Sequence, residues 1–437
     1  MTERRLRRIV ALAASSMALA ISATALSGTS AGAASGGATA PGVTSKSITV
    51  GSLATLSGPL SSGFGDIVYG ARAYFDMINA KGGVNGRKIN LAYVVDDTGS
   101  ATVDQDEARN LVAQDHVFAI VGVGSPFFTA NTYLCQTGTP TFGYVVVDNW
   151  SKCPNLFGAY GSTLTYNTGE MTVGFLAKQL GVKSAAVVAY SIAPSSKDAC
   201  AAYAAGLTHY GVHVGFVDLN LGYAADPTPD VQAMVSAHTD FLMTCTDGPE
   251  NLKFVEALHQ YGLGSAHVLW LTGYDRTVIA QNASVMTGSI FSLQHVPFEA
   301  AKFFPGKYPA MQQYLATMKK YEPQWTYDDT SIQGYINAAQ FVAGLRAVGP
   351  NLTQKKLVAA INAEKSYNAG GLMPPIDPNW KVAHSSATGP FCNSYVQVMA
   401  GGVLAPAEVQ GGDQTLVCFK QGSDTPLPLP PHTPPSS

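Results

Sequence analysis

The stretch GSLATLSGPLSSGFGDIVYGARAYFDMINAKGGVNGRKINLAYVVDD, residues 51–97, predicts a strand, a helix and a second strand in direct succession. The first strand belongs to the apolar, β-branched run 48–54, and the second covers 89–97. Between them, Asp66 precedes a helical pattern and is a residue type that caps helix N-termini. The apolar residues that recur at helical spacing are Ile67, Ala71, Tyr74, Phe75 and Ile78.

A glycine-rich connector, GGVNG at residues 82–86, separates this helix from the second strand. Glycine adopts the left-handed conformation of a helix C-terminus without a Cβ penalty, which suits Gly82 and Gly83. The pair Asn85-Gly86 favours a tight turn. The sequence therefore predicts a compact helix-to-strand connection.

The chain keeps alternating between strand and helix patterns. Such βαβ repeats with almost continuously apolar strands indicate parallel sheets covered by helices on both faces, and so an α/β fold. Two runs of this kind extend to about residue 163 and over about 165–293, followed by a helical region at 309–361 and two antiparallel strands. The further strands are expected at 117–124, 184–190, 212–218, 240–245, 267–272, 392–400 and 414–420, and the clearest further helices at 103–115 and 249–261.

Composition limits the function classes. The chain has 437 residues, of which 46% are hydrophobic and 13% charged, with a net charge of −3. A chain of this length can bury more than one core. Its near-neutral charge argues against a nucleic-acid partner, because nucleic-acid binding leaves a basic footprint.

The N-terminus has the pattern of a signal peptide over residues 1–33: a basic start, an apolar run at 9–26, and Ala31-Gly32-Ala33 as a cleavage site. The alternative is a retained membrane anchor. We expect cleavage, followed by a Gly/Ala/Ser linker at 34–45 and export to the periplasm, the cell wall or the medium. The arginines of the basic start are Arg4, Arg5, Arg7 and Arg8.

The rest of the sequence predicts no membrane insertion of the mature chain. No other stretch approaches the roughly 20 apolar residues that span a bilayer. No cysteine precedes Cys135, so the usual lipoprotein tether is not expected. At the other end, the Pro-rich tail 422–437 is expected to be disordered or extended.

Six cysteines allow fifteen pairings, and an exported protein permits disulfides. We predict pairing between nearest neighbours, while free buried thiols are the alternative. No Cys-x-x-Cys pair is present, which argues against a zinc site. The predicted pairs are Cys135 with Cys153, Cys200 with Cys245, and Cys392 with Cys418.

Residues 51–97 closely resemble the first βαβ unit of type I periplasmic substrate-binding proteins, in particular the branched-chain amino acid (Leu/Ile/Val) branch of ABC transporters. The matching elements include Leu56-Ser57-Gly58-Pro59, Gly70-Ala71 and the GGVNG connector, and a looser match extends to about residue 420. The resemblance implies two Rossmann-like lobes joined by three hinge segments, with a ligand between them and a permease as partner. By this analogy, the lobes comprise residues 46–163 plus 296–378 and residues 164–295 plus 379–421.

Ligands of open α/β sheets bind at the carboxyl ends of the strands. In the first lobe, Phe64 matches an aromatic residue that covers the ligand in the resembling family, although an ordinary surface loop is the alternative. Ser125 precedes a helix start that can hold an anion, or it is a simple helix cap. Pro126 removes one backbone donor there. Tyr144 and Asp148 follow the next strand, where the family contacts its ligand.

In the second lobe, Asp247 and Asp275 follow strands at positions beside the family's ligand. The glutamate that the family uses against a ligand ammonium is not in place, and either aspartate could replace it by a charge-assisted bond. A helix cap is the alternative for both. Together with Phe64, Phe127 and Tyr144 of the first lobe, Tyr274 suggests an apolar or aromatic pocket.

These residues predict a solute-binding protein that captures an amino acid or another amine-bearing molecule with an apolar side chain for an ABC importer. The alternative is a secreted sensor or scavenger of a non-amino-acid ligand. No Gly-x-Ser-x-Gly, His-Glu-x-x-His or Gly-x-x-x-x-Gly-Lys motif occurs, so no enzyme activity is expected. No cofactor or metal is expected either.

Overall fold

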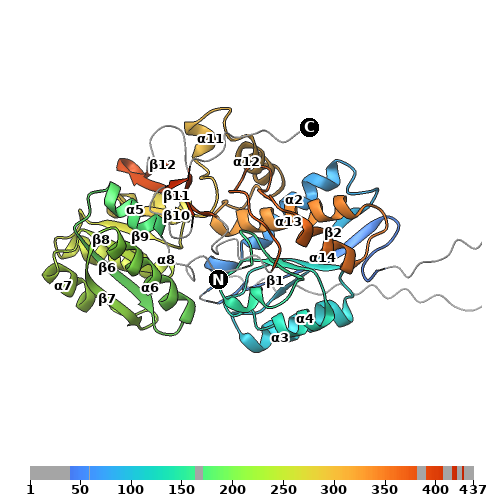
Figure 1. The fold of residues 1–437 in the computed structure, drawn as a ribbon, viewed down its shortest axis with the longest axis horizontal. Coiled ribbons are helices and arrows are strands. Elements are labelled where there is room, and N and C mark those ends of the chain that lie inside the picture. Colours follow the sequence, from blue (N-terminus) through green and yellow to red (C-terminus); the bar gives the residue numbers. More distant parts are fainter. Residues whose placement is uncertain are drawn as a thin grey trace, which may run out of the picture. The chain divides into compact units, whose positions relative to one another are not determined.

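The computed structural model describes residues 40–58, 60–162, 171–380, 390–406, 416–420 and 426–427 (Figure 1). The predicted signal peptide lies outside these residues, as do residues 34–39 of the predicted linker. Most of the predicted tail also lies outside them.

The first sheet has five strands in the order β2-β1-β3-β4-β5, and all neighbouring pairs are parallel. Because parallel strands need crossover connections, this order confirms the predicted βαβ organisation. The strands are β1 (Ser47–Ala54), β2 (Lys88–Asp96), β3 (Ala119–Val123), β4 (Thr141–Gly143) and β5 (Leu156–Gly158).

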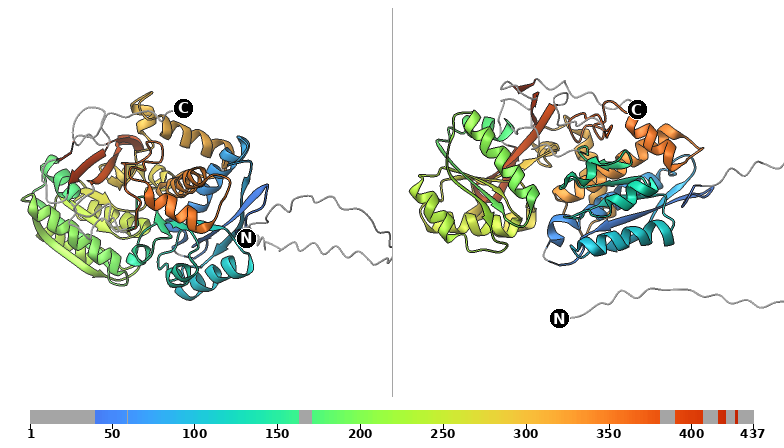
Figure 2. Two further views of the ribbon diagram at one scale, coloured as in Figure 1. Left: turned by 45° about the vertical axis from the view of Figure 1, so that its right-hand side comes forward. Right: turned by 60° about the horizontal axis from the view of Figure 1, so that its bottom comes forward.

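The helices of this first region include a late segment of the chain that returns to it. Helix α13 lies against α2 although more than 200 residues separate them in the sequence (Figure 2). A Cβ on Gly70 would lie 1.7 Å from the Ser331 carbonyl oxygen, and one on Gly334 would lie 1.8 Å from that of Ile67. Glycine at both positions therefore allows backbone-to-backbone packing. The helices are α1 (Ser61–Phe64), α2 (Ile67–Ala80), α3 (Ala101–Arg109), α4 (Asn131–Thr137), α12 (Pro309–Tyr321), α13 (Asp329–Val348) and α14 (Gln354–Ala363).

The second sheet is mixed and has nine strands, in the order β14-β13-β11-β10-β9-β8-β6-β7 with β12 beside β11. The strands from β6 to β10 are parallel, whereas β11 and β13 are antiparallel to their neighbours, as predicted. The strands are β6 (Ser184–Tyr190), β7 (His213–Leu221), β8 (Phe241–Cys245), β9 (His267–Trp270), β10 (Ile290–Leu293), β11 (Pro390–Met399), β12 (Val403–Pro406), β13 (Leu416–Lys420) and β14 (Pro426–Leu427).

Helix α6 packs on β6, β7 and β8, and α5 packs on α6 and β11. In the order of the described elements, the chain changes from one sheet region to the other three times, after β5, after β10 and after α14, which agrees with the expected three hinge segments. The exact lobe bounds remain a prediction. The helices here are α5 (Met171–Gln179), α6 (Pro194–His209), α7 (Thr228–Ser236), α8 (Gly248–Gln260), α9 (Arg276–Gln281), α10 (Ala283–Met286) and α11 (Ala300–Phe303).

Two local predictions are confirmed. Gly82, Gly83, Asn85 and Gly86 have φ angles of 102°, 82°, 48° and 77°, as the connector requires. The three disulfides are those expected from nearest-neighbour pairing. A third prediction holds only in position: Asp66 is the N-cap residue of α2, but its side chain makes no capping bond.

Candidate functional site

At the carboxyl edge of the first sheet, two aromatic rings meet. Phe64 belongs to the short helix after β1, Tyr144 follows β4, and their ring centroids are 5.7 Å apart. Both side chains are partly exposed. The structure thus brings together two of the predicted ligand contacts, and they form an apolar surface.

The loop after β3 is stabilised by a buried hydrogen bond within the loop. The Ser125 hydroxyl is buried and accepts a hydrogen bond from the Phe128 N–H at 3.3 Å, so it stabilises its own loop. Phe127, in contrast, is 44% exposed. A Cβ on Gly124 would lie 2.3 Å from the Phe64 carbonyl oxygen, so this loop touches the Phe64 loop backbone to backbone.

Two buried carboxylates stabilise these loops by accepting hydrogen bonds from them. Sequence reasoning missed this role. Asp104 accepts hydrogen bonds from the Ala130 N–H at 2.6 Å and the Thr129 hydroxyl at 3.2 Å. Burial raises the pKa of Asp104 to about 6, and the charge of Asp97 adds to this. Asp97 accepts from the Thr55 hydroxyl at 2.6 Å. The sequence did carry a signal for Asp104, because this acid occupies a helical position where an apolar residue is expected.

Asp148 lies on an exposed 3-10 turn, Asp148–Ser151, next to the buried Trp150. Trp150 stacks on Phe128 with ring centroids 4.0 Å apart and belongs to the core. The buried Trp150 therefore fixes the turn to the core, while Asp148 itself is exposed.

The carboxyl edge of the second sheet combines an acid with apolar side chains. Asp247 is the N-cap of α8 and accepts hydrogen bonds from the Glu250 N–H and the Tyr190 hydroxyl, both at 3.0 Å. The Tyr190 ring lies 5.7 Å from that of Tyr223. Tyr223 is 43% exposed and Ile192, just after β6, is 66% exposed. Sequence reasoning missed these three apolar residues, although they stand at or just after strand ends.

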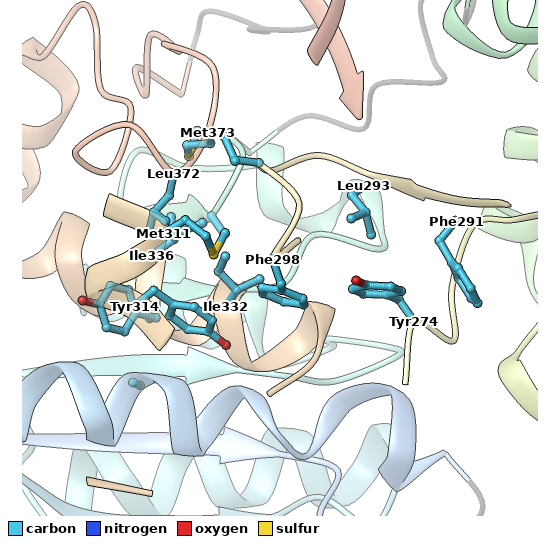
Figure 3. Packing of buried hydrophobic residues seen from close by; sticks show 14 of the residues in the cluster. Tyr274, Phe291, Leu293, Phe298, Met311, Tyr314, Ile332, Ile336, Leu372 and Met373 are labelled. Atoms are coloured by element: carbon cyan, nitrogen blue, oxygen red, sulfur yellow. The ribbon is translucent and has the colours of Figure 1, made fainter. Parts of the chain in front are cut away.

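Asp275 and Tyr274 have different surroundings despite being adjacent. Asp275 is the N-cap of α9 and accepts from the N–H groups of Thr277 at 2.7 Å and Val278 at 3.2 Å. Tyr274 is buried and donates its hydroxyl to Glu299. Its ring packs against those of Phe291 and Phe298 (Figure 3). Asp275 is thus the accessible member of the pair.

Further acids gather at the start of α13. Asp328 is the N-cap of that helix and forms a capping box with Ser331. Burial raises the pKa of Asp66, a hydrogen bond with Asp328 opposes this, and the negative charge of Asp275 raises it further. Burial also holds the pKa of Asp328 well above its usual range, and Asp66 adds to the effect. Carboxylates from both sheet systems therefore interact electrostatically.

His295 connects the segment after β10 to this acidic group. It is fully buried, its Nδ1 lies 2.7 Å from the Val296 carbonyl oxygen, and its Nε2 lies 3.0 Å from Asp329 Oδ1. Burial of the Tyr144 hydroxyl and the charge of Asp329 raise the pKa of Tyr144, while a hydrogen bond with Gln333 opposes the rise. A hinge segment, α13 and the β4 loop therefore meet at Asp329, a residue that the sequence did not single out.

The chain belongs to the periplasmic binding protein family, whose family model matches residues 47–389. No curated protein sequence matches it significantly. Within the described residues, no group of three or more metal-binding side chains occurs. The helices of that part of the chain are too short or too polar to cross a bilayer.

Solved structures share the fold. The chain is similar to a fatty acid ABC transporter substrate-binding protein from Thermomonospora curvata, at 18% identity and a TM-score of 0.68, covering 88% of this chain and 95% of that one. A solute-binding protein from R. palustris in complex with 4-hydroxybenzoate is 19% identical with a TM-score of 0.68, covering 87% and 98%. A possible leucine/isoleucine/valine-binding protein from Rhodopirellula baltica SH 1 is 17% identical with a TM-score of 0.66, covering 84% and 97%.

Proposed function

We propose that this protein is an extracytoplasmic solute-binding protein that captures an amine-bearing small molecule with an apolar side chain and delivers it to an ABC importer. The observation that carries the proposal is that exposed apolar side chains occur at the carboxyl ends of strands in both sheets. Exposed apolar groups at such edges mark binding surfaces. Phe127 and Phe64 contribute from the first sheet, Ile192 and Tyr223 from the second.

The charges near these edges favour a cationic group on the ligand. Burial is the main cause of the raised pKa of Asp66, and the negative charge of Asp275 adds to it, so the two carboxylates repel each other when both are ionised. A ligand ammonium near both acids relieves this repulsion and gains charge-assisted hydrogen bonds. Recognition of a ligand carboxylate has weaker support, because Ser125 already bonds the Phe128 N–H and Pro126 lacks a donor.

The ligand acts on an equilibrium between open and closed lobes. It can shift that equilibrium only by its higher affinity for the closed form. Apolar contacts from both edges supply such a difference, because each lobe alone offers only half of them. An importer that recognises the closed form then distinguishes loaded from empty protein.

Calorimetric titration of the mature protein tests the proposal with a panel of apolar and aromatic amino acids, their decarboxylated amines and their deaminated carboxylates. We expect binding of members that carry both an amine and an apolar side chain, without turnover. Phe64→Ala should weaken it about tenfold through lost apolar contact. Tyr93→Ala, which removes an exposed ring on β2, is the matched control.

Two outcomes contradict the proposal. If no member of the panel binds although the protein is folded, an amine-bearing ligand is excluded. Binding of the deaminated carboxylates alone, where Phe64→Ala weakens it, assigns the site at the strand ends to a different ligand class, like that named for the fatty acid and 4-hydroxybenzoate proteins.

A further inference from the structure

A cavity of about 520 Å³ lies beside the segment that follows β10. We call it the hinge pocket. Its volume falls within the roughly 300–1,000 Å³ typical of small-molecule sites. Its lining residues come from α9, the segment around α11, α12, the residue before the α13 cap, the end of the 3-10 turn Ala400–Gly402, and β12. They are Arg276, Ile279, Ala280, Phe298, Glu299, Ala301, Lys302, Leu315, Tyr327, Gly402, Val403 and Leu404.

The walls of the hinge pocket combine an apolar part with a polar part of nearly equal extent. Ile279, Phe298 and Leu404 are buried side chains that present part of their surface to the cavity, and Leu315 of α12 is partly exposed. Figure 3 shows Phe298 placed between Tyr274 and the aliphatic residues of α13, so the wall is part of a continuous core. The apolar part of the wall favours a ligand with an apolar body.

The charged lining residues leave one positive charge in excess. Arg276 forms an ion pair with Glu299, and Lys302 adds an exposed ammonium group. The Arg276 guanidinium also lies over the Tyr327 ring, 5.2 Å from its centroid. A guanidinium has five N–H donors, so Arg276 retains donors for a second acceptor. This arrangement complements a monoanion.

We infer that the hinge pocket is a second binding site, which takes a small monocarboxylate with an apolar body. The carboxylate binds Lys302 and the free donors of Arg276, and the apolar body contacts Leu315 and Ile279. This site differs from the one proposed above, because its lining includes none of the residues at the exposed strand ends, such as Phe64 or Tyr223. The inference therefore does not depend on the amine-bearing ligand.

Titration with hexanoate and with phenylacetate, followed by calorimetry, tests the second site on the mature protein. Leu315→Trp fills the pocket and should abolish binding of both probes, whereas Ala316→Trp, one residue further on the exposed side of α12, should leave it unchanged. Lys302→Gln should weaken binding about tenfold through the lost charge. Lys319→Gln, on the exposed surface of α12, is its control.

The results separate the two sites. Retained hexanoate binding in Phe64→Ala supports the second site, and loss of binding in Phe64→Ala equal to that in Leu315→Trp overturns it. The inference is also overturned if folded wild-type protein binds neither probe, or if Leu315→Trp and Ala316→Trp bind alike. Because Lys302 is exposed, its variant folds even if Leu315→Trp does not.

Discussion

The carboxyl edges of the two sheets use their acids differently. At the first edge, Asp97 and Asp104 are buried beneath the loops and hold them, so that Phe64 and Phe127 remain at the surface. At the second edge, Asp247 and Asp275 cap helices and stay partly exposed. One edge therefore offers rigid apolar contact, and the other offers negative charge beside apolar groups.

The largest expected effect concerns the disulfides that stabilise each region. Chain-entropy arguments give about 4 kcal/mol for the Cys200–Cys245 bond and about 3 kcal/mol for Cys135–Cys153, because their separations are 45 and 18 residues. Unfolding by denaturant of the two double Cys→Ser variants measures this. A larger loss for Cys135–Cys153 would show that the loops of the first edge depend on their disulfide more than on Asp104.

The next effect tests the contact between loops at the first edge. Gly124→Ala should lower the free energy of unfolding by about 3 kcal/mol, because the new Cβ meets the Phe64 backbone. Gly248→Ala is the counterpart at the second edge, where the Cβ would lie 3.3 Å from the Gly273 Cα, and should cost less than about 1 kcal/mol. Chemical denaturation measures both values. If the two variants lose the same free energy of unfolding, the edges do not differ in this way.

The pH dependence of stability tests the buried acid. The pKa of Asp104 is about 6 in the folded chain against an ordinary 3.8, so the folded chain binds the proton more tightly. Its contribution to stability therefore falls as pH rises from about 4 to about 6 and is constant above. Between pH 4 and pH 7, the free energy of unfolding of the wild type should fall by about 2 kcal/mol relative to that of Asp104→Asn. Urea unfolding at each pH measures this free energy. The same pH dependence in the two proteins would contradict this assignment.

The smallest expected effect concerns the charge at the second edge. Asp275→Asn should weaken binding of an amine-bearing ligand about tenfold, while stability is kept because asparagine is an equally good N-cap. Asp106→Asn, which changes an exposed acid on α3, is the control in the same titration. Unchanged affinity in the Asp275 variant would transfer the ammonium role to Asp247.

Local patterns predicted the fold well. The GGVNG connector, strand 184–190 and the three disulfides are as expected, because glycine conformations, apolar runs and short separations depend on neighbouring residues. The site was less predictable. Sequence reasoning assigned Tyr274 to an apolar or aromatic pocket, and it did not foresee that the Tyr274 ring lies between Phe291 and Phe298.

Other parts of the site depend on contacts between distant segments. The His295–Asp329 pair joins residues 34 positions apart, and Tyr190 reaches Asp247 over 57 positions. No periodicity in the sequence carries such information. The hinge pocket likewise exists only because β12, α9 and α12 enclose it, and its lysine and leucine have no distinctive sequence pattern.

A crystal structure of the mature protein with the tightest ligand of the amine-bearing panel tests the central claim most directly. We expect the ligand between the two strand edges, with its ammonium near Asp275 and its apolar part against Phe64. Density for that ligand away from both edges, or a ligand that contacts only one sheet, would contradict the account.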